Sequence, residues 1–215
     1  MEKRTFTYGE IAKEVARLHV LFKSIGFAKG DKIALVGKNG PKWCIVYIAT
    51  VTYGGVIVPI LQDFNPNDIQ HIVNHSDAKF LFISDNLWDN LFGEDLLYVN
   101  GVFSLNDYRC IHQRDGYSIQ KAHKVWDENF QEAFPNGFSA ADVLYPTIPN
   151  SEMVCISYTS GSTGFSKGVM LSANAFAGNI TYGIETKLLE PGSRCLAFLP
   201  LAHAYGCAFD FLTSF

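Results

Sequence analysis

The sequence predicts an α/β fold with mostly parallel sheets flanked by helices. Short uncharged runs rich in Val and Ile alternate along the chain with amphipathic segments, which is the rhythm of strand–helix–strand units. Gly, Asn and Pro mark the boundaries between these segments. The chain has 215 residues, of which 48% are hydrophobic, so it can bury a sizeable core.

The first helix has the clearest boundaries. Thr7 and Glu10 form a capping box, in which each side chain satisfies a backbone N–H at the start of the helix. Apolar residues then recur at helical spacing up to Gly26, which suits the position just after a helix. A second helix opens at Pro41, where the missing N–H costs nothing. Further helices are predicted from Pro66, around 119–134, and from the Ser172 cap.

The predicted strands are short apolar runs bounded by turn residues. In chain order they are 33–36, 56–60, 80–83, 153–158, 169–171 and 194–199. Residues 102–150 are less regular, with polar clusters and three prolines. We therefore divide residues 1–215 into a first α/β half at 1–101, an irregular connection at 102–150 and a second half at 151–215. Because the chain stops at Phe215 inside an apolar segment, we expect an N-terminal fragment whose C-terminal part is absent.

The charge balance argues against a nucleic-acid partner. There are 17 Lys and Arg against 21 Asp and Glu, a net charge of −4. Residues 44–61 carry no charge and approach the length of a membrane-spanning helix, but Gly54-Gly55 and Pro59 instead predict a helix followed by a buried strand. We expect no transmembrane span, which leaves room for peripheral membrane contact.

The cysteines indicate a reducing compartment. Their count is five, their neighbours are apolar and none of them forms a CxxC pair, which predicts free, buried thiols. No basic-then-apolar leader follows Met1, so we expect a cytoplasmic location.

The segment 157–168, Ser-Tyr-Thr-Ser-Gly-Ser-Thr-Gly-Phe-Ser-Lys-Gly, carries the chemistry. Its glycines let several backbone N–H groups converge on an anion, and Lys167 adds a mobile positive charge. It follows a predicted strand, where α/β proteins bind ligands. These features predict polyphosphate binding. Four hydroxyl groups can donate to phosphate oxygens, those of Thr159, Ser160, Ser162 and Thr163.

Three better-known motifs are excluded by spacing. A P-loop needs Gly-Lys-Ser/Thr, whereas Lys167 lies between Ser166 and Gly168. A nucleophile elbow needs a residue between Gly and Ser, whereas Gly161 directly precedes Ser162. The chain has no Gly-x-Gly-x-x-Gly either. A plain flexible surface loop is the remaining alternative from composition alone.

This segment resembles the phosphate-binding signature of the adenylate-forming, AMP-binding superfamily, which includes acyl-CoA synthetases, luciferases and peptide-synthetase adenylation domains. The likeness is strongest to long-chain fatty-acyl-CoA synthetases and spans nearly the whole chain, in order. One departure is Ser166, where the family usually has Pro. The residues that carry the resemblance are 158–164 with Lys167-Gly168-Val169, Leu199-Pro200-Leu201-Ala202-His203, and the early stretches 7–10, 30–34 and 53–59.

The resemblance implies a partial N-terminal AMP-binding domain and a ligase that activates a carboxylic acid, here a long-chain fatty acid, with ATP. The acyl-adenylate would pass its acyl group to CoA, releasing AMP and pyrophosphate, with Mg²⁺ bridging phosphate oxygens. Lys167 would offset charge on the departing pyrophosphate, and His203 would lie near the acyl carboxylate. Later family elements would follow Phe215, so we expect the fragment alone to be inactive. The implied ATP contacts are Thr159, Ser160, Gly161, Ser162, Thr163, Gly164 and Lys167.

Several alternatives stay open at this point. The enzyme could adenylate an aryl or amino acid, the chain could be a noncatalytic nucleotide- or lipid-binding module, or it could belong to another phosphotransferase. His203 could also be a histidine packed at a strand end. His71 and His75 are spaced i, i+4 as metal ligands can be, but Ile72 replaces the Glu of a zinc-protease helix, which favours a solvated helix face.

Overall fold

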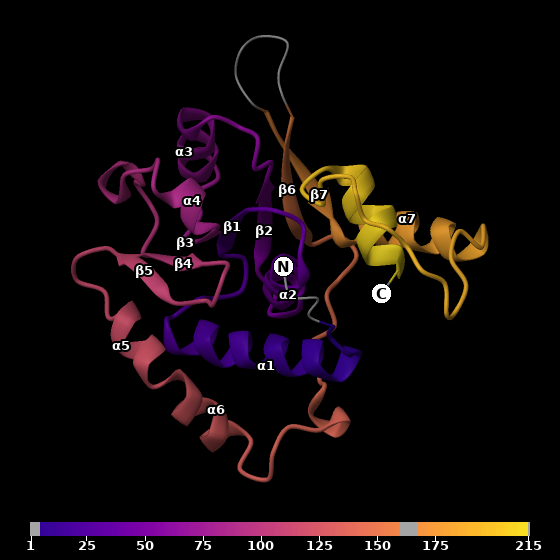
Figure 1. The fold of residues 1–215 in the computed structure, drawn as a ribbon, viewed down its shortest axis with the longest axis horizontal. Helices are drawn as coiled ribbons and strands as arrows, with labels where there is room; N and C mark the ends of the chain where they lie inside the picture. Colours follow the sequence, from indigo (N-terminus) through magenta and orange to yellow (C-terminus); the bar gives the residue numbers. More distant parts are fainter. Residues whose placement is uncertain (1–4, 160–166, 215) are drawn as a thin grey trace.

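The computed structural model describes residues 5–159 and 167–214. Its helices and strands alternate as the sequence predicts (Figure 1). The helices are α1 Tyr8–Ser24, α2 Pro41–Thr52, α3 Pro66–His75, α4 Asp85–Trp88, α5 Ile119–Lys124, α6 Trp126–Ala133 and α7 Ala173–Glu185, with 3-10 turns at Gly93–Asp95, Ala140–Asp142 and Leu212–Ser214 and a π-helical segment at Gly206–Phe211. The strands are β1 Lys32–Val36, β2 Val56–Ile60, β3 Phe80–Ile83, β4 Gly101–Ser104, β5 Cys110–Gln113, β6 Met153–Thr159 and β7 Lys167–Ser172.

One mixed sheet forms the centre of the described residues. Its strand order is β5-β4-β3-β1-β2-β6-β7. The five inner strands run parallel, and β5 and β7 pair antiparallel at the two edges. The predicted, mostly parallel α/β fold is therefore confirmed. Because parallel strands end on the same side, the segments that follow β1, β2, β3, β4 and β6 all leave the sheet at the carboxyl ends of the strands. We call this side of the sheet its carboxyl edge.

Helices cover both faces of this sheet, and the two-residue period of the strands decides which side chain meets which helix. Ile33 and Leu35 of β1 pack with buried residues of α1 and α2, whereas Ala34 and Val36 pack with those of α3. These strand residues are completely buried. The two hydrophobic cores account for the near-continuous apolar strands, since each strand faces a helix on both sides.

The capping predictions are confirmed. The Thr7 hydroxyl accepts the Glu10 N–H, and the Glu10 carboxylate accepts the Thr7 N–H at 2.7 Å. Gly26 adopts a φ of 73°, the left-handed conformation that a glycine allows after a helix. The uncharged stretch 44–61 divides into α2 and β2, as expected. No helix among the described residues has both the length and the apolar character needed to cross a bilayer.

Two expectations about strands were wrong. Residues 194–199 form no strand, and Leu196 and Phe198 are 79% and 75% exposed. Conversely, β4 and β5 extend the sheet through residues that the sequence analysis treated as part of an irregular connection. An apolar run forms a strand only where a neighbouring strand offers unpaired backbone groups, and the sequence alone does not show which strand that is.

The prediction of buried thiols was right for Cys155 and Cys207 and wrong for Cys195, which is exposed. Cys44 and Cys110 are half-buried. All five cysteines are free. Cys195 lies in residues 194–199, which form no strand, so the sheet does not bury it.

Phe82 gives a direct test of the core. It is completely buried and stacks on Phe103 with 4.9 Å between ring centroids. We expect Phe82→Ala to lower the free energy of unfolding by about 3–5 kcal/mol, because it loses apolar burial and leaves a cavity. Phe92→Ala is the matched control, since Phe92 is 69% exposed and should change stability by less than about 0.5 kcal/mol. Urea denaturation with unchanged m-values measures both, and equal midpoints for the two variants would contradict this picture of the core.

Candidate functional site

The β6–β7 hairpin positions Thr159 and Lys167, the described residues on either side of 160–166. Thr159 ends β6 and Lys167 begins β7, and the two residues are direct partners in the antiparallel register. Both are exposed. The structure thus brings together a hydroxyl and an ammonium group at the stem of the predicted phosphate loop. The remaining predicted ATP contacts, Ser160, Gly161, Ser162, Thr163 and Gly164, lie outside the described residues.

The residue before Thr159 holds this stem in place. Tyr158 is 8% exposed and pairs with Gly168 across the hairpin. A Cβ on Gly168 would approach the Tyr158 Cζ atom to 3.1 Å, so the glycine makes room for the aromatic ring. An aromatic residue that covers a glycine on an edge strand compensates for the missing side chain.

The Tyr158 hydroxyl also bonds to α3. It lies 2.7 Å from Nδ1 of His75, the last residue of that helix. Burial, with a smaller contribution from the negative charge of Asp77, raises the pKa of Tyr158 to about 12. The phenol therefore keeps its proton near neutral pH and can donate it to the imidazole. His71 and His75 are exposed, as expected, but His75 has a structural partner that its helical spacing did not indicate.

His203 lies in a turn before the π-helical segment. Its backbone N–H donates to the Pro200 carbonyl at 2.9 Å, and its backbone carbonyl accepts the Cys207 N–H at 2.9 Å. The ring atom Nδ1 accepts the Tyr205 N–H at 3.3 Å. Because a backbone N–H can only donate, the neutral imidazole carries its proton on Nε2. His203 is exposed, so this Nε2–H is a hydrogen-bond donor at the surface of the described residues.

No hydrogen bond or ion pair joins His203 to Lys167 in the part of the chain that the structure describes. The two residues come from separate segments, one at the start of β7 and one beyond α7. The structure therefore assembles Thr159 and Lys167 directly and leaves His203 as a separate contributor. The alternative that His203 packs at the end of a strand is wrong, because the preceding residues 194–199 form no strand.

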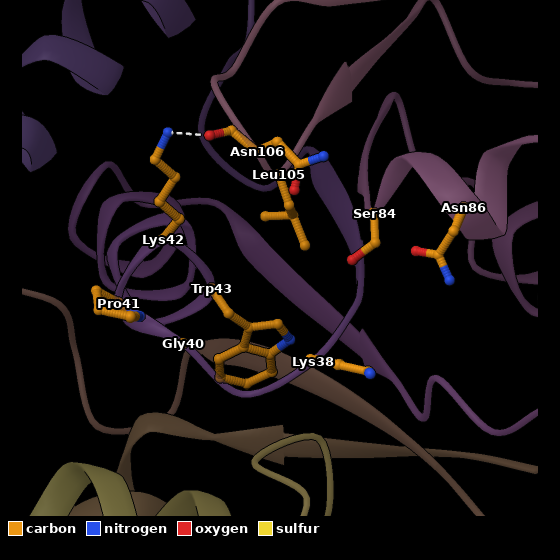
Figure 2. A pocket seen from close by; sticks show the side chains of 9 residues that line it. All are labelled: Lys38, Gly40, Pro41, Lys42, Trp43, Ser84, Asn86, Leu105 and Asn106. Atoms are coloured by element: carbon orange, nitrogen blue, oxygen red, sulfur yellow. Dashed lines mark hydrogen bonds between the residues drawn. The ribbon is translucent and has the colours of Figure 1, made fainter. Parts of the chain in front are cut away.

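A cavity lies at the same edge of the sheet as the hairpin stem (Figure 2). It lies beyond the carboxyl ends of β1 and β3, which are neighbours in the sheet. From β1 the chain continues to β2 on one side, and from β3 it continues to β4 on the other side. Open α/β sheets commonly bind ligands at such a switch point. The Lys42 ammonium is bonded to the Asn106 carbonyl there. Two lysines give the lining positive charge, and Trp43 and Leu105 add apolar surface. The cavity has a volume of about 430 Å³ and is lined by Lys38, Gly40, Pro41, Lys42, Trp43, Ser84, Asn86, Leu105 and Asn106.

Metal binding by a preformed protein cluster finds no support in the described residues. They contain no group of three or more His, Cys, Asp or Glu side chains that could hold an ion. His71 and His75 have ring centroids 5.6 Å apart, but no third His, Cys, Asp or Glu among the described residues completes such a group.

A profile of the AMP-binding enzyme family matches residues 1–215. The chain belongs to this family. The resemblance to the adenylate-forming, AMP-binding superfamily is thereby confirmed.

Known relatives include several acid–CoA ligases. The chain is 27% identical over 201 residues to long chain acyl-CoA synthetase 7, peroxisomal, of Arabidopsis thaliana, covering 93% of this chain and 28% of the relative. It is 28% identical over 200 residues to sulfoacetate–CoA ligase of Cupriavidus necator, covering 93% and 36%. The chain thus spans about a third of the length of the relatives it matches.

Solved structures share the fold. The ATP-bound crystal structure of MatB from Rhodopseudomonas palustris superposes with a TM-score of 0.73 at 21% identity, covering 98% of this chain and 38% of that one. Such a likeness establishes the architecture of the AMP-binding family member described here. The substrate depends on the residues of the site rather than on the fold.

The Tyr158–His75 contact gives a test through alkaline pH. Burial of the phenol means that the folded chain binds this proton more tightly than the unfolded chain does. Its contribution to stability is complete below about pH 10 and is lost as the pH rises toward about 12. We expect Tyr158→Phe to lower stability by about 0.5–1.5 kcal/mol at pH 7 and to lose less stability than the parent between pH 10 and 12.

Denaturant titrations of the parent and of Tyr158→Phe at pH 7, 10 and 12 measure the free energy of unfolding at each pH. Tyr117→Phe is the matched control, because Tyr117 is also a tyrosine but is 43% exposed, and we expect it to behave as the parent chain. If Tyr158→Phe retained the full alkaline loss, burial at this position would not be its cause.

Proposed function

We propose that a polypeptide carrying this chain activates a carboxylic acid with ATP and transfers the acyl group to CoA. A carboxylate oxygen attacks the α-phosphorus of ATP, the bond to the β-phosphate oxygen breaks, and pyrophosphate leaves. The thiolate of CoA then displaces AMP from the acyl-adenylate. The single observation that supports this most is the family match over residues 1–215. Thr159 and Lys167 are paired at the carboxyl end of β6, the part of a strand where open α/β sheets commonly bind ligands.

In this proposal the stem residues act on the phosphates. The Thr159 hydroxyl donates to a phosphate oxygen, and the Lys167 ammonium offsets the charge that builds on pyrophosphate as it departs. Ser160, Gly161, Ser162, Thr163 and Gly164 supply further hydroxyl and backbone donors to the β- and γ-phosphates. ATP arrives as its magnesium complex, and phosphate oxygens are the main ligands of that ion.

His203 serves the acid in the same proposal. Its Nε2–H, fixed by the Tyr205 N–H on the opposite ring nitrogen, donates to the carboxylate and orients it for attack. Beside it lies an aromatic group: the rings of Tyr205 and Phe209 are 4.9 Å apart, and Tyr182 lies 6.4 Å from Phe209. Tyr182 and Tyr205 are more than half exposed, so this group offers an apolar surface for an acyl chain.

We propose a long-chain fatty acid as the acid. The aromatic group beside His203 supports this, as does the similarity to long chain acyl-CoA synthetases 3, 4 and 7 of Arabidopsis thaliana. We also propose that the protein works in the cytoplasm and contacts membranes only peripherally, where such an acid partitions.

Product analysis tests the reaction class. With ATP, CoA and a carboxylic acid, the catalytically active polypeptide should release AMP and pyrophosphate in a one-to-one ratio. A panel of long-chain, short-chain, aryl and amino acids then identifies the substrate by kcat/KM. Release of ADP and phosphate would indicate a phosphotransferase, and ATP binding without turnover of any acid would indicate a noncatalytic module.

Lys167→Ala should slow acyl-adenylate formation about 10²- to 10³-fold, the usual effect of losing one donor to a developing charge. Acid-dependent exchange of labelled pyrophosphate into ATP measures this step. Lys124→Ala is the matched control, since Lys124 is exposed on α5 at the other side of the sheet and should leave the rate unchanged. Equal rates for the two variants would show that Lys167 does not contact the phosphates.

A further inference from the structure

We propose that Asn39 is a positioning residue that fixes the segment carrying His203 against the carboxyl edge of the sheet. The role of His203 itself rests on the proposed function. The contacts of Asn39 do not, because they are properties of the described fold.

Asn39 uses both ends of its side-chain amide on one distant segment. Its Nδ2 donates to the Leu199 carbonyl at 2.7 Å and to the Ala197 carbonyl at 3.3 Å. Its Oδ1 accepts the Leu201 N–H at 3.0 Å. These bonds join a turn just after β1 to residues about 160 positions later in the chain. The amide thus pairs with residues 197–201 much as a neighbouring strand would.

The 197–201 segment needs such a partner because none of the strands in residues 5–159 and 167–214 pairs with it. Residues 191–199 contain no helix or strand, and Leu196 and Phe198 project into solvent. Backbone groups without secondary structure must bond to side chains or water. Asn39 satisfies three of them, and Leu201, which is 3% exposed, adds an apolar contact with the core. The segment is therefore held at Asn39 and at Leu201.

The path from these contacts to the imidazole is short and tightly packed. His203 is two residues beyond Leu201, and its N–H donates to the carbonyl of Pro200. Gly206 packs against that same carbonyl so closely that a Cβ there would lie 2.6 Å from its oxygen. The Tyr205 N–H then fixes the ring through Nδ1. A shift of the 197–201 segment would therefore move the His203 ring with it.

An ordinary role for Asn39 makes a different prediction. Asn39 precedes Gly40, the residue at the N-cap of α2, so it could merely favour the turn or the helix start. Aspartate serves those roles as well as asparagine, and its charge suits a helix N-terminus. At the contacts described here, however, a carboxylate has no N–H to donate and would face the Leu199 and Ala197 carbonyl oxygens. Asn39→Asp therefore separates the two roles.

The first experiment measures amide hydrogen exchange in this chain. We expect Asn39→Ala, which removes the acceptor of the Leu201 N–H, to accelerate exchange of the Leu201 amide about tenfold or more, while amides of β1 keep their protection. Asn129→Ala is the matched control, because the Asn129 amide donates to Ser24 on the α1 side of the sheet. If Asn39→Ala left exchange at Leu201 unchanged, the proposal would be overturned whatever reaction the protein catalyses.

The second experiment uses the catalytically active polypeptide. Asn39→Asp should lower kcat/KM for the carboxylic acid about three- to thirtyfold and leave KM for ATP unchanged, because Asn39 acts through the acid-binding histidine. The effect should largely disappear in a His203→Ala background, since removal of the imidazole leaves nothing to position. Faster exchange at Leu201 together with additive kinetic effects would overturn the link to His203, while leaving the proposed adenylation intact.

Discussion

The parallel pairing of β6 with β2 is the contact on which the site depends. It joins the two halves of the chain through a register in which Ile57 opposes Cys155. Since β6 runs in the same direction as β1, β2 and β3, its carboxyl end leaves the sheet beside theirs. That single alignment places the Thr159–Lys167 stem, the turn that carries Asn39 and the cavity after β3 along one edge. An antiparallel β6 would have placed the Thr159–Lys167 stem at the opposite edge.

The sequence predicted those parts of the fold whose signals are local. A capping box, a glycine after a helix and a proline in a first turn each act through neighbours within four residues, and all of these boundaries appear in the structure. Strand pairing is a long-range property, so 194–199 looked like a strand although it joins no strand of the described sheet. The opposite error occurred at β5, whose Cys-Ile-His-Gln sequence has little strand character but pairs with β4.

The site divides in the same way. Thr159, Lys167 and His203 could be selected from the sequence because their chemistry is visible in short motifs. His75 and Asn39 could not, because their partners lie 83 and about 160 residues away. A histidine at the end of an amphipathic helix and an asparagine in a Gly-rich turn have ordinary local explanations. Only the folded chain shows that each bonds to a segment with a candidate functional residue.

These two tethers share a physical property that suits them to their position. The Asn39 amide is uncharged, and the Tyr158 phenol keeps its proton because burial raises its pKa to about 12. A charged tether would also hold a loop, but it would add its own electrostatic field to this edge of the sheet. Under the proposed function a carboxylate meets a polyphosphate at this edge, where an extra anion would repel both and an extra cation would compete with Lys167 for the phosphates. Neutral hydrogen bonds fix the geometry and leave the positive charge at the stem to the lysine.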